Sequence, residues 1–227
     1  SSPTFASRND AMTSRYVVLL GDSIGTSQGV SSGRGFMELL AKQLKPHDVR
    51  VENWSMGGMT ARSLVQSLSR IQNRLSQLAS KAPKDGLFVL VELGGNDRLY
   101  GIPANQIEDY LRQLLEAVQR VPARPLLMEV IPDGIEQDVA QRCQVPLIPT
   151  PPGLAATIQG AVKRGKVPRF SSKYVQEDGI HPNAKAQRLI LAQIVKVLAV
   201  ELDLPLDEPL TEVDAQGECR AFHCSLQ

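Results

Sequence analysis

The chain has few cysteines, no excess of charge of either sign and no long apolar run. Three cysteines in 227 residues are too few for a disulfide framework. The 25 basic and 24 acidic residues nearly cancel, so nucleic acid is not expected as a partner. No apolar stretch approaches the roughly 20 residues that cross a bilayer, so we expect no transmembrane segment. With 42% apolar residues, the chain can bury one large core without a metal or disulfides.

The two ends of the chain differ from its middle. Residues 1–14 are polar and lack periodicity, which predicts an N-terminal tail. From Asp203 the chain turns acidic and contains prolines, so residues 203–227 are interpreted as a C-terminal tail. Residues 15–202 are therefore predicted to form a single folded domain. The sequence gives no indication of the oligomeric state.

The start of the chain and its cysteines bear on where the protein works. The first residue is Ser1 rather than Met, so we expect that an upstream segment, such as a signal peptide, was removed or is not included. Cys219 and Cys224 can close a small loop in an oxidising compartment, and Cys143 lies apart from them. Together with His223 they offer three metal ligands, but no second pair follows at zinc spacing, which favours a disulfide or free thiols over a metal. We expect a periplasmic or secreted location, with the cytoplasm as the alternative, and no metal.

Short β-rich runs alternate with helical patterns through the domain. Strands are predicted at residues 16–20, 49–54, 87–93, 125–131 and 145–148. Apolar residues at helical spacing predict helices over 36–44, 61–78 and 107–118, and a last helix that starts near Pro182. Strands separated by helices form right-handed β-α-β units. The pattern predicts an α/β fold, a three-layer sandwich with a central parallel sheet of about five strands.

Polar sequences follow three of these strands. Gly21-Asp22-Ser23 follows the first, residues 53–58 follow the second, and residues 94–97 follow the third. In open α/β sheets, ligands gather at the carboxyl ends of the strands. All three sequences are therefore expected to open onto one edge of the sheet.

Ser23 is the candidate nucleophile because it lies just past a buried strand. A sharp strand-to-helix turn there would lift its hydroxyl above the sheet. A serine needs a base within hydrogen-bond reach and a group that orients that base. The alternative is that a serine after Gly-Asp caps a helix or shapes a turn.

His181 is the candidate base among only three histidines. Asp178 precedes it by three residues, with Gly179 between them, so its carboxylate can turn back and accept a hydrogen bond from the ring. The other ring nitrogen is then free for Ser23. A loop histidine with an aspartate nearby by chance would have the same spacing, and His47 lies in a polar connection typical of a solvated loop.

Asn96 and Gly58 are the candidate donors for an oxyanion. Asn96 follows two glycines at the end of the most clearly predicted strand, where its side-chain amide can donate. Gly58 and Ser23 can offer their backbone N–H groups. Glycine turns that merely lead into helices would explain Gly58 and Asn96 as well.

Two other motifs are rejected. Gly21 to Gly25 matches the G-x-S-x-G elbow of α/β-hydrolases, but Ser31 sits in a second match, and several strands precede the elbow in that fold, whereas one precedes Ser23. The glycine- and serine-rich stretch over 25–35 is no phosphate-binding loop, because no Gly-Lys-Ser/Thr follows it.

Taken together, four blocks resemble the SGNH (GDSL-type) hydrolase family. They are Gly-Asp-Ser-Ile, Asn-Trp-Ser-Met-Gly-Gly, Leu-Gly-Gly-Asn-Asp and Asp-Gly-Ile-His-Pro-Asn, in order over residues 16–195. The context is most similar to the bacterial arylesterase/acyl-thioesterase/lysophospholipase branch. Ile24 stands where leucine is usual in the family, and residues 132–152 look shorter than in that branch, so its chain-length preference is not carried over.

The resemblance implies a flavodoxin-like fold and a cofactor-free site. Ser23 matches the family nucleophile, Asp178 and His181 match its Asp-x-x-His pair, and Gly58 and Asn96, with the Ser23 N–H, match its oxyanion donors. The implied activity is hydrolysis of acyl or aryl esters, thioesters or lysophospholipids through an acyl-enzyme. A carbohydrate O-acetylesterase with the same residues and a non-catalytic ester- or lipid-binding module are the alternatives.

Three apolar side chains near the predicted oxyanion loop are candidates for the acyl site. They are Trp54, Met56 and Met59. Buried packing is the other common use of such residues. The expected partner is a small-molecule ester or lipid.

Overall fold

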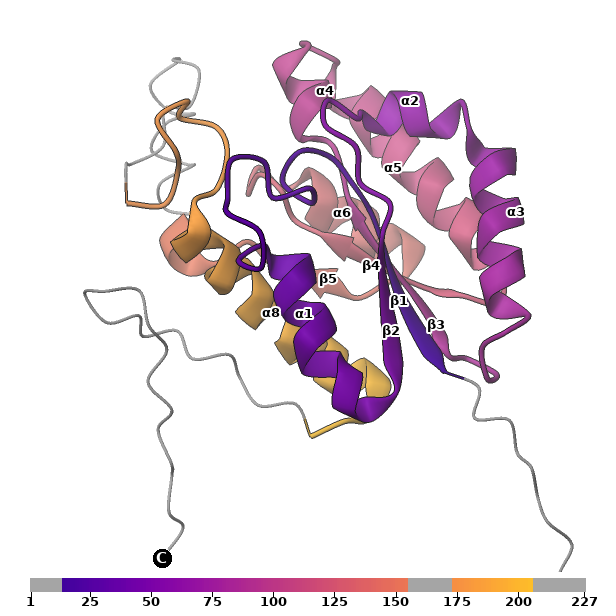
Figure 1. The fold of residues 1–227 in the computed structure, drawn as a ribbon. Helices are drawn as coiled ribbons and strands as arrows, with labels where there is room; N and C mark the ends of the chain where they lie inside the picture. Colours follow the sequence, from indigo (N-terminus) through magenta and orange to yellow (C-terminus); the bar gives the residue numbers. More distant parts are fainter. Residues whose placement is uncertain (1–13, 155–172, 206–227) are drawn as a thin grey trace, which may run out of the picture.

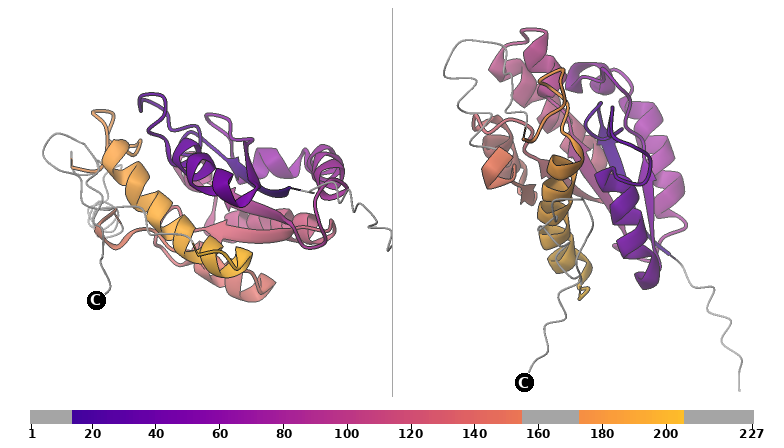
Figure 2. Two further views of the ribbon diagram at one scale, coloured as in Figure 1. Left: turned by 60° about the horizontal axis from the view of Figure 1, so that its bottom comes forward. Right: turned by 60° about the vertical axis from the view of Figure 1, so that its left-hand side comes forward.

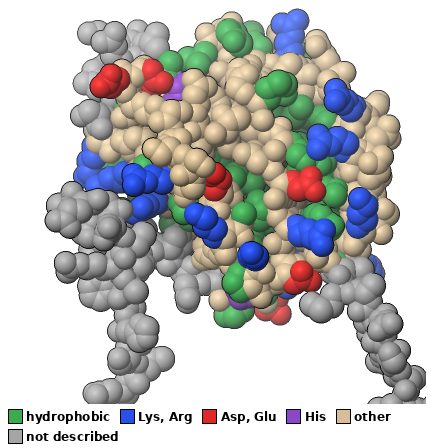
Figure 3. All heavy atoms as spheres, in the orientation of Figure 1, with side chains coloured by type: hydrophobic (Ala, Val, Ile, Leu, Met, Phe, Trp, Pro, Cys, Tyr) green, Lys and Arg blue, Asp and Glu red, His purple; other side chains and the backbone are tan. Residues whose placement is uncertain are grey.

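A computed structural model describes residues 14–154 and 173–205 (Figure 1). Most of both predicted tails, with Cys219, His223 and Cys224, lies outside the described residues, so the domain limits and the pairing of those cysteines stay predictions. In the described part, no helix is long and apolar enough to cross a membrane. On the face seen in Figure 3, Lys and Arg side chains are interrupted by acidic and apolar ones and form no continuous basic band.

The centre of the fold is a five-stranded sheet in the order β2-β1-β3-β4-β5. The strands are β1 (Arg15–Gly21), β2 (Val49–Asn53), β3 (Leu87–Glu92), β4 (Arg124–Met128) and β5 (Leu147–Ile148). Every pair of neighbours is parallel. This confirms the predicted α/β sandwich with a parallel sheet of five strands.

Helices cover both faces of the sheet. One face carries α1 (Phe36–Leu44) and α8 (Ala184–Leu202), which lie side by side (Figure 2). The other face carries α2 (Ala61–Val65), α3 (Leu68–Ala79), α5 (Ala104–Gln119) and α6 (Ile135–Cys143). Two shorter elements with given bounds are α4 (Gly95–Leu99) and a 3₁₀ turn (Lys45–His47).

Alternation along the central strands creates two separate cores. In β1, Val17 and Leu19 pack with α1 and α8, while Val18 and Leu20 pack with the helices of the opposite face. Successive side chains of a strand point to opposite faces. A strand covered on both faces must therefore be apolar throughout, as the sequence suggested.

Several element boundaries differ from the sequence prediction. Thr60 caps α2, because its side chain accepts the Ser63 N–H. The predicted helix over 61–78 is in fact two, since the backbone leaves the helical conformation at Ser67 (φ −115°, ψ 16°). Pro182 precedes the last helix rather than opening it, and the Asn183 side chain caps that helix instead. The periodicity of the sequence did not reveal α4 or α6.

Candidate active site

The carboxyl ends of three strands meet at one edge of the sheet, as expected. Ser23 lies in the turn after β1, Gly58 in the loop after β2, and Asn96 in α4 after β3. A fourth segment, residues 173–183, folds over this edge before α8 begins. Its two arms meet at an antiparallel bridge between Val175 and Pro182, with His181 and Asp178 between them.

The structure brings Ser23, His181 and Asp178 into one hydrogen-bonded chain. The Ser23 hydroxyl lies 2.9 Å from Nε2 of His181, and Nδ1 of His181 lies 2.6 Å from Oδ2 of Asp178. Ser23 is buried (8% exposed), whereas 42% of the Asp178 side chain is exposed. This is the arrangement that a serine needs to lose its proton to a base.

Asp178 is held as a carboxylate by hydrogen bonds. Its Oδ1 accepts the backbone N–H groups of Ile180 (2.9 Å) and His181 (3.0 Å), which fixes the turn between the two side chains. Desolvation acts to raise its pKa, but the bonds from the His181 ring and from the two N–H groups outweigh it and lower the pKa of Asp178 to about 2. The carboxylate therefore fixes which nitrogen of the ring faces Ser23.

The predicted oxyanion donors lie around Ser23 but differ in availability. The backbone N–H groups of Ser23 and Gly58 have no acceptor among the described residues. Gly58 has φ +75°, a conformation that favours glycine. Both hydrogens of the Asn96 amide are already used, since Nδ2 donates to Oδ2 of Asp22 and to the Met59 carbonyl, each at 2.9 Å. To donate to a substrate, Asn96 has to share one of these bonds.

Two buried carboxyl groups next to Ser23 were not singled out from the sequence. Oε2 of Glu92 accepts the backbone N–H groups of Asp22 (3.1 Å) and Gly25 (3.2 Å), on either side of Ser23. The Asp22 carboxylate accepts the Ile24 N–H at 2.9 Å as well as the Asn96 amide. The signal in the sequence was Glu92 itself, the one charged residue in the apolar run over 87–93.

An apolar cavity of about 100 Å³ opens beside Ser23. Its apolar lining comes from the turn after β1, from the ends of β4 and β5, from α4 and α8, and from nearby loops: Ile24, Leu99, Met128, Val130, Ile131, Ile148, Pro149, Pro151, Leu154, Val175, Ile180, Pro182 and Ile190. A Cβ atom on Gly95 would lie 3.2 Å from Val130, so glycine at this position lets that wall come close to Asn96.

The three predicted acyl-site residues are not among the lining residues of this cavity. Trp54 packs against the core, donates to Glu52 (2.8 Å) and stacks under Arg74. Met59 also packs against the core, and its sulfur accepts the Ser63 hydroxyl. Met56 is 58% exposed. Their apolar character fitted packing as well as substrate binding, and no pattern in the sequence placed β4, β5 and α8 around the cavity.

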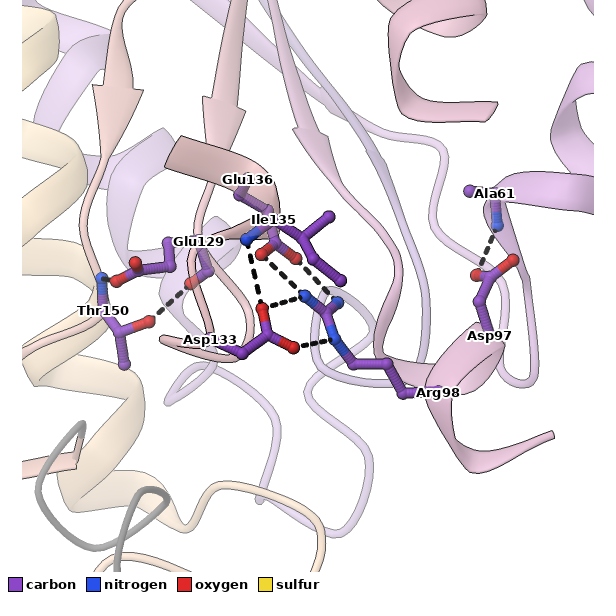
Figure 4. Close-up of polar contacts among 8 residues, drawn as sticks. All are labelled: Ala61, Asp97, Arg98, Glu129, Asp133, Ile135, Glu136 and Thr150. Carbon is purple, nitrogen blue, oxygen red and sulfur yellow. Dashed lines mark hydrogen bonds and ion pairs between the residues drawn. The ribbon is translucent and has the colours of Figure 1, made fainter. Parts of the chain in front are cut away.

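An ion-pair cluster ties α4 to the segment that follows β4 (Figure 4). The Arg98 guanidinium donates two hydrogen bonds to Asp133 and two to Glu136, at 2.6 to 2.8 Å. Burial raises the pKa of Glu136, and the bonds from Arg98 oppose that shift. Val130 and Ile131 of the cavity wall lie just before Asp133, so the cluster fixes this wall against α4.

Asp97, next to Asn96, anchors the other side of α4 (Figure 4). It is fully buried and accepts the N–H groups of Ala61 (2.8 Å) and Arg62 (3.2 Å) at the start of α2. These two bonds join α4, which carries Asn96, to the start of α2, which follows the loop that carries Gly58. Among the described residues, no group of three His, Cys, Asp or Glu side chains is placed to hold a metal ion.

Sequence comparison connects this site to known proteins. Residues 19–189, more than half of the chain, match the GDSL-like Lipase/Acylhydrolase family. The chain is 31% identical to "Thioesterase 1/protease 1/lysophospholipase L1" of Escherichia coli (strain K12) over 194 residues, which cover 80% of this chain and 82% of that protein.

The chain belongs to this family. It is a hydrolase of the SGNH type, and the predicted resemblance is confirmed. It is also 26% identical to an arylesterase of Vibrio mimicus over 196 residues, 85% of this chain and 92% of that one.

Solved structures of other SGNH hydrolases share the fold. TesA superposes with a TM-score of 0.64 at 24% identity, and the match covers 82% of this chain and 99% of TesA. The psychrotrophic esterase EstA from Pseudoalteromonas sp. also has a TM-score of 0.64 at 24% identity, with 83% and 99% covered. At these identities the likeness concerns the fold alone.

Proposed function

We propose that this SGNH hydrolase cleaves carboxylic esters through an acyl-enzyme on Ser23. The observation that carries the proposal is the unbroken chain from the Ser23 hydroxyl through the His181 ring to the Asp178 carboxylate, with links of 2.9 and 2.6 Å. A buried serine, an oriented base and free N–H groups at one strand edge are the parts that acyl transfer requires.

The first half-reaction forms the acyl-enzyme. His181 takes the Ser23 proton on Nε2 as Oγ attacks the ester carbonyl carbon. The negative charge that develops on the carbonyl oxygen is met by the N–H groups of Ser23 and Gly58 and by the Asn96 amide. The C–O bond to the leaving alcohol then breaks, and His181 gives its proton to that oxygen. Asp178 keeps the ring oriented and stabilises it while it is charged.

The second half-reaction releases the acid. His181 takes a proton from a water molecule, whose oxygen attacks the acyl carbon. The bond to Ser23 then breaks, and the proton on His181 returns to Oγ. No cofactor enters either half-reaction.

The apolar cavity favours an acyl group longer than acetyl. Most of its exposed lining is aliphatic, and burying each methylene of an acyl chain there contributes about 0.8 kcal/mol. The names of the relatives, a thioesterase/lysophospholipase and an arylesterase, agree with acyl and aryl esters, thioesters or lysophospholipids as substrates. A periplasmic or secreted location stays a prediction.

The test is hydrolysis of p-nitrophenyl esters from acetyl to palmitoyl by the wild type and by Ser23→Ala. We expect turnover by the wild type and a loss of several orders of magnitude, about 10⁴-fold or more, in Ser23→Ala. Ser31→Ala is the matched control, because Ser31 occupies the other G-x-S-x-G match and is exposed. It should retain full activity.

Three other outcomes separate the alternatives. Equal activity of Ser23→Ala and wild type would exclude Ser23 as the nucleophile. Turnover of acetyl esters alone would favour a carbohydrate O-acetylesterase over the proposal. A folded wild type without activity on esters, thioesters and acetylated sugars would favour a binding module.

A further inference from the structure

Glu92 ends β3 directly beneath the turn that carries Ser23. It is 1% exposed, and none of the ion pairs among the described residues includes it. One carboxyl oxygen, Oε2, accepts the N–H groups of Asp22 and Gly25, while the other, Oε1, is buried without a hydrogen-bond partner. A Cβ atom on Gly21 would lie 2.7 Å from Oε2, so glycine there lets the carboxyl reach the turn.

A chain of hydrogen bonds leads from Glu92 to all three oxyanion donors. Its bonds to Asp22 and Gly25 fix the backbone on both sides of the Ser23 N–H. Asp22 in turn accepts the Asn96 amide. The same amide donates to the carbonyl oxygen of Met59, which directly follows Gly58.

The charges around Glu92 favour its neutral form. Burial raises the pKa of Glu92 well above its ordinary value, and the charge of Asp22 raises it further. Burial also raises the pKa of Asp22, to about 6, against the bond from the Ile24 N–H. The other titratable groups that face Asp22 are His181, whose charge lowers its pKa, and Asp97, which raises it. Because burial raises the pKa of both carboxyl groups, the two groups favour holding a proton between them.

We propose that Glu92 is a positioning residue for the oxyanion hole and that it works as a neutral carboxylic acid. Oε2, as the carbonyl oxygen, accepts the two N–H groups around Ser23. Oε1, which has no donor, carries the proton toward Asp22. Asp22 then remains the carboxylate that orients Asn96. This role rests on the proposed function, because it lies within the same site.

Two substitutions of similar size test the role. Glu92→Gln keeps an acceptor for both N–H groups and a donor toward Asp22, so we expect kcat and its pH profile to stay close to those of the wild type. Glu92→Leu removes the acceptor, and we expect kcat on p-nitrophenyl butyrate to fall about 10²-fold, as when one oxyanion donor is lost. KM should change less than kcat, since Glu92 lines the cavity but is only 1% exposed, and the aliphatic residues of the wall are unchanged.

The protonation state is measured independently of activity. In infrared spectra at pH 8, the wild type should show the carbonyl stretch of a protonated carboxylic acid, and Glu92→Gln should lack it. Glu136→Gln is the control, since Glu136 is equally buried but bonded to Arg98, and it should retain the band. This measurement tests whether Glu92 is protonated even if Glu92→Leu does not fold.

Three results would overturn the proposal. They are a Glu92→Gln variant as inactive as Glu92→Leu, a Glu92→Leu variant as active as the wild type, and the absence of the infrared band. Failure of the proposed function would look different, because wild type and Glu92→Gln would then both lack ester turnover while the band persisted.

Discussion

The two sides of the candidate site are built differently. The strand side, with Ser23 and Asn96 at the ends of β1 and β3, is mostly buried, and Glu92 and Asp97 bind its backbone N–H groups. The loop side, with Asp178 and His181, is partly open to solvent. Groups that stabilise developing charge act best when they are fixed and dry, while a proton carrier needs only the right orientation. Changes to Asp178 or His181 on the loop side should therefore cost mainly activity, whereas changes to the buried groups of the strand side should cost stability too.

The largest expected effect in this comparison is that of Asp178→Asn. The amide can no longer stabilise a charged His181 ring, so we expect kcat to fall about 10²- to 10⁴-fold. The melting temperature should stay near that of the wild type, because the side chain is 42% exposed. Steady-state kinetics and thermal denaturation measure the two quantities. Glu177→Gln is the control, since it makes the same change from carboxylate to amide at an exposed neighbouring residue. It should change neither kcat nor the melting temperature. A large loss of stability in Asp178→Asn would contradict the expectation that changes to the loop-side pair mainly reduce activity.

Arg98→Met tests the strand side. Removing this cation leaves the fully buried Glu136 without its partner, which costs about 3 kcal/mol of unfolding free energy, or roughly 6 to 12 °C in melting temperature. Arg112→Met breaks exposed ion pairs within α5 and should change the melting temperature little. Equal melting temperatures for the two variants would contradict the interpretation that Arg98 fixes the cavity wall.

The two sides should respond to pH with opposite signs. The pKa of Asp178 is lowered to about 2, so its contribution to stability is present above its ordinary value of 3.8 and is lost as the pH falls toward 2; solvent screening keeps this contribution small, because the side chain is 42% exposed. The pKa of Asp22 is raised to about 6, so its contribution is present below 3.8 and is lost as the pH rises through 6. The wild type should therefore lose stability over this pH range and Asp22→Asn should not. As the pH rises from 4 to about 6 to 7, the melting temperature of Asp22→Asn should increase relative to that of the wild type. For Asp178→Asn, the difference in melting temperature from the wild type should change only below about pH 4. The same pH dependence for both variants would contradict the expected opposite responses.

The smallest expected effect is that of Gln176→Ala. Its side chain donates to the Gln28 carbonyl (2.5 Å) and to the Pro182 carbonyl (3.3 Å), and so ties the loop side to the Ser23 turn. We expect a loss of about 1 kcal/mol in stability and a several-fold fall in kcat. Gln28→Ala keeps the accepting carbonyl and should behave as wild type. If both variants are unchanged, the loop is held by other contacts, such as the Asn183 amide on the Lys173 carbonyl.

Local signals in the sequence were sufficient for the strands and for the residues of the proposed triad. β1 and β3 are apolar runs, β2 alternates apolar with polar residues, and Thr60 is a cap with its own hydrogen-bond acceptor. Ser23 and the Asp178–His181 pair stood out because nucleophile, base and orienting group have few possible spacings. The break between α2 and α3, and the short α4 and α6, follow from packing against neighbours, which periodicity does not record.

By itself, the sequence determined the parallel sheet, the family and the edge at which the polar residues gather, because these follow from the order and spacing of residues along the chain. Only the tertiary structure decided which walls form the cavity and what surrounds the buried carboxyls. Trp54 and Met59 pack against the core, partly buried, while residues of β4, β5 and α8 line the cavity. Burial and the approach of distant segments set these properties, and Glu92 meets the Ser23 turn only because β1 and β3 are neighbours in the sheet.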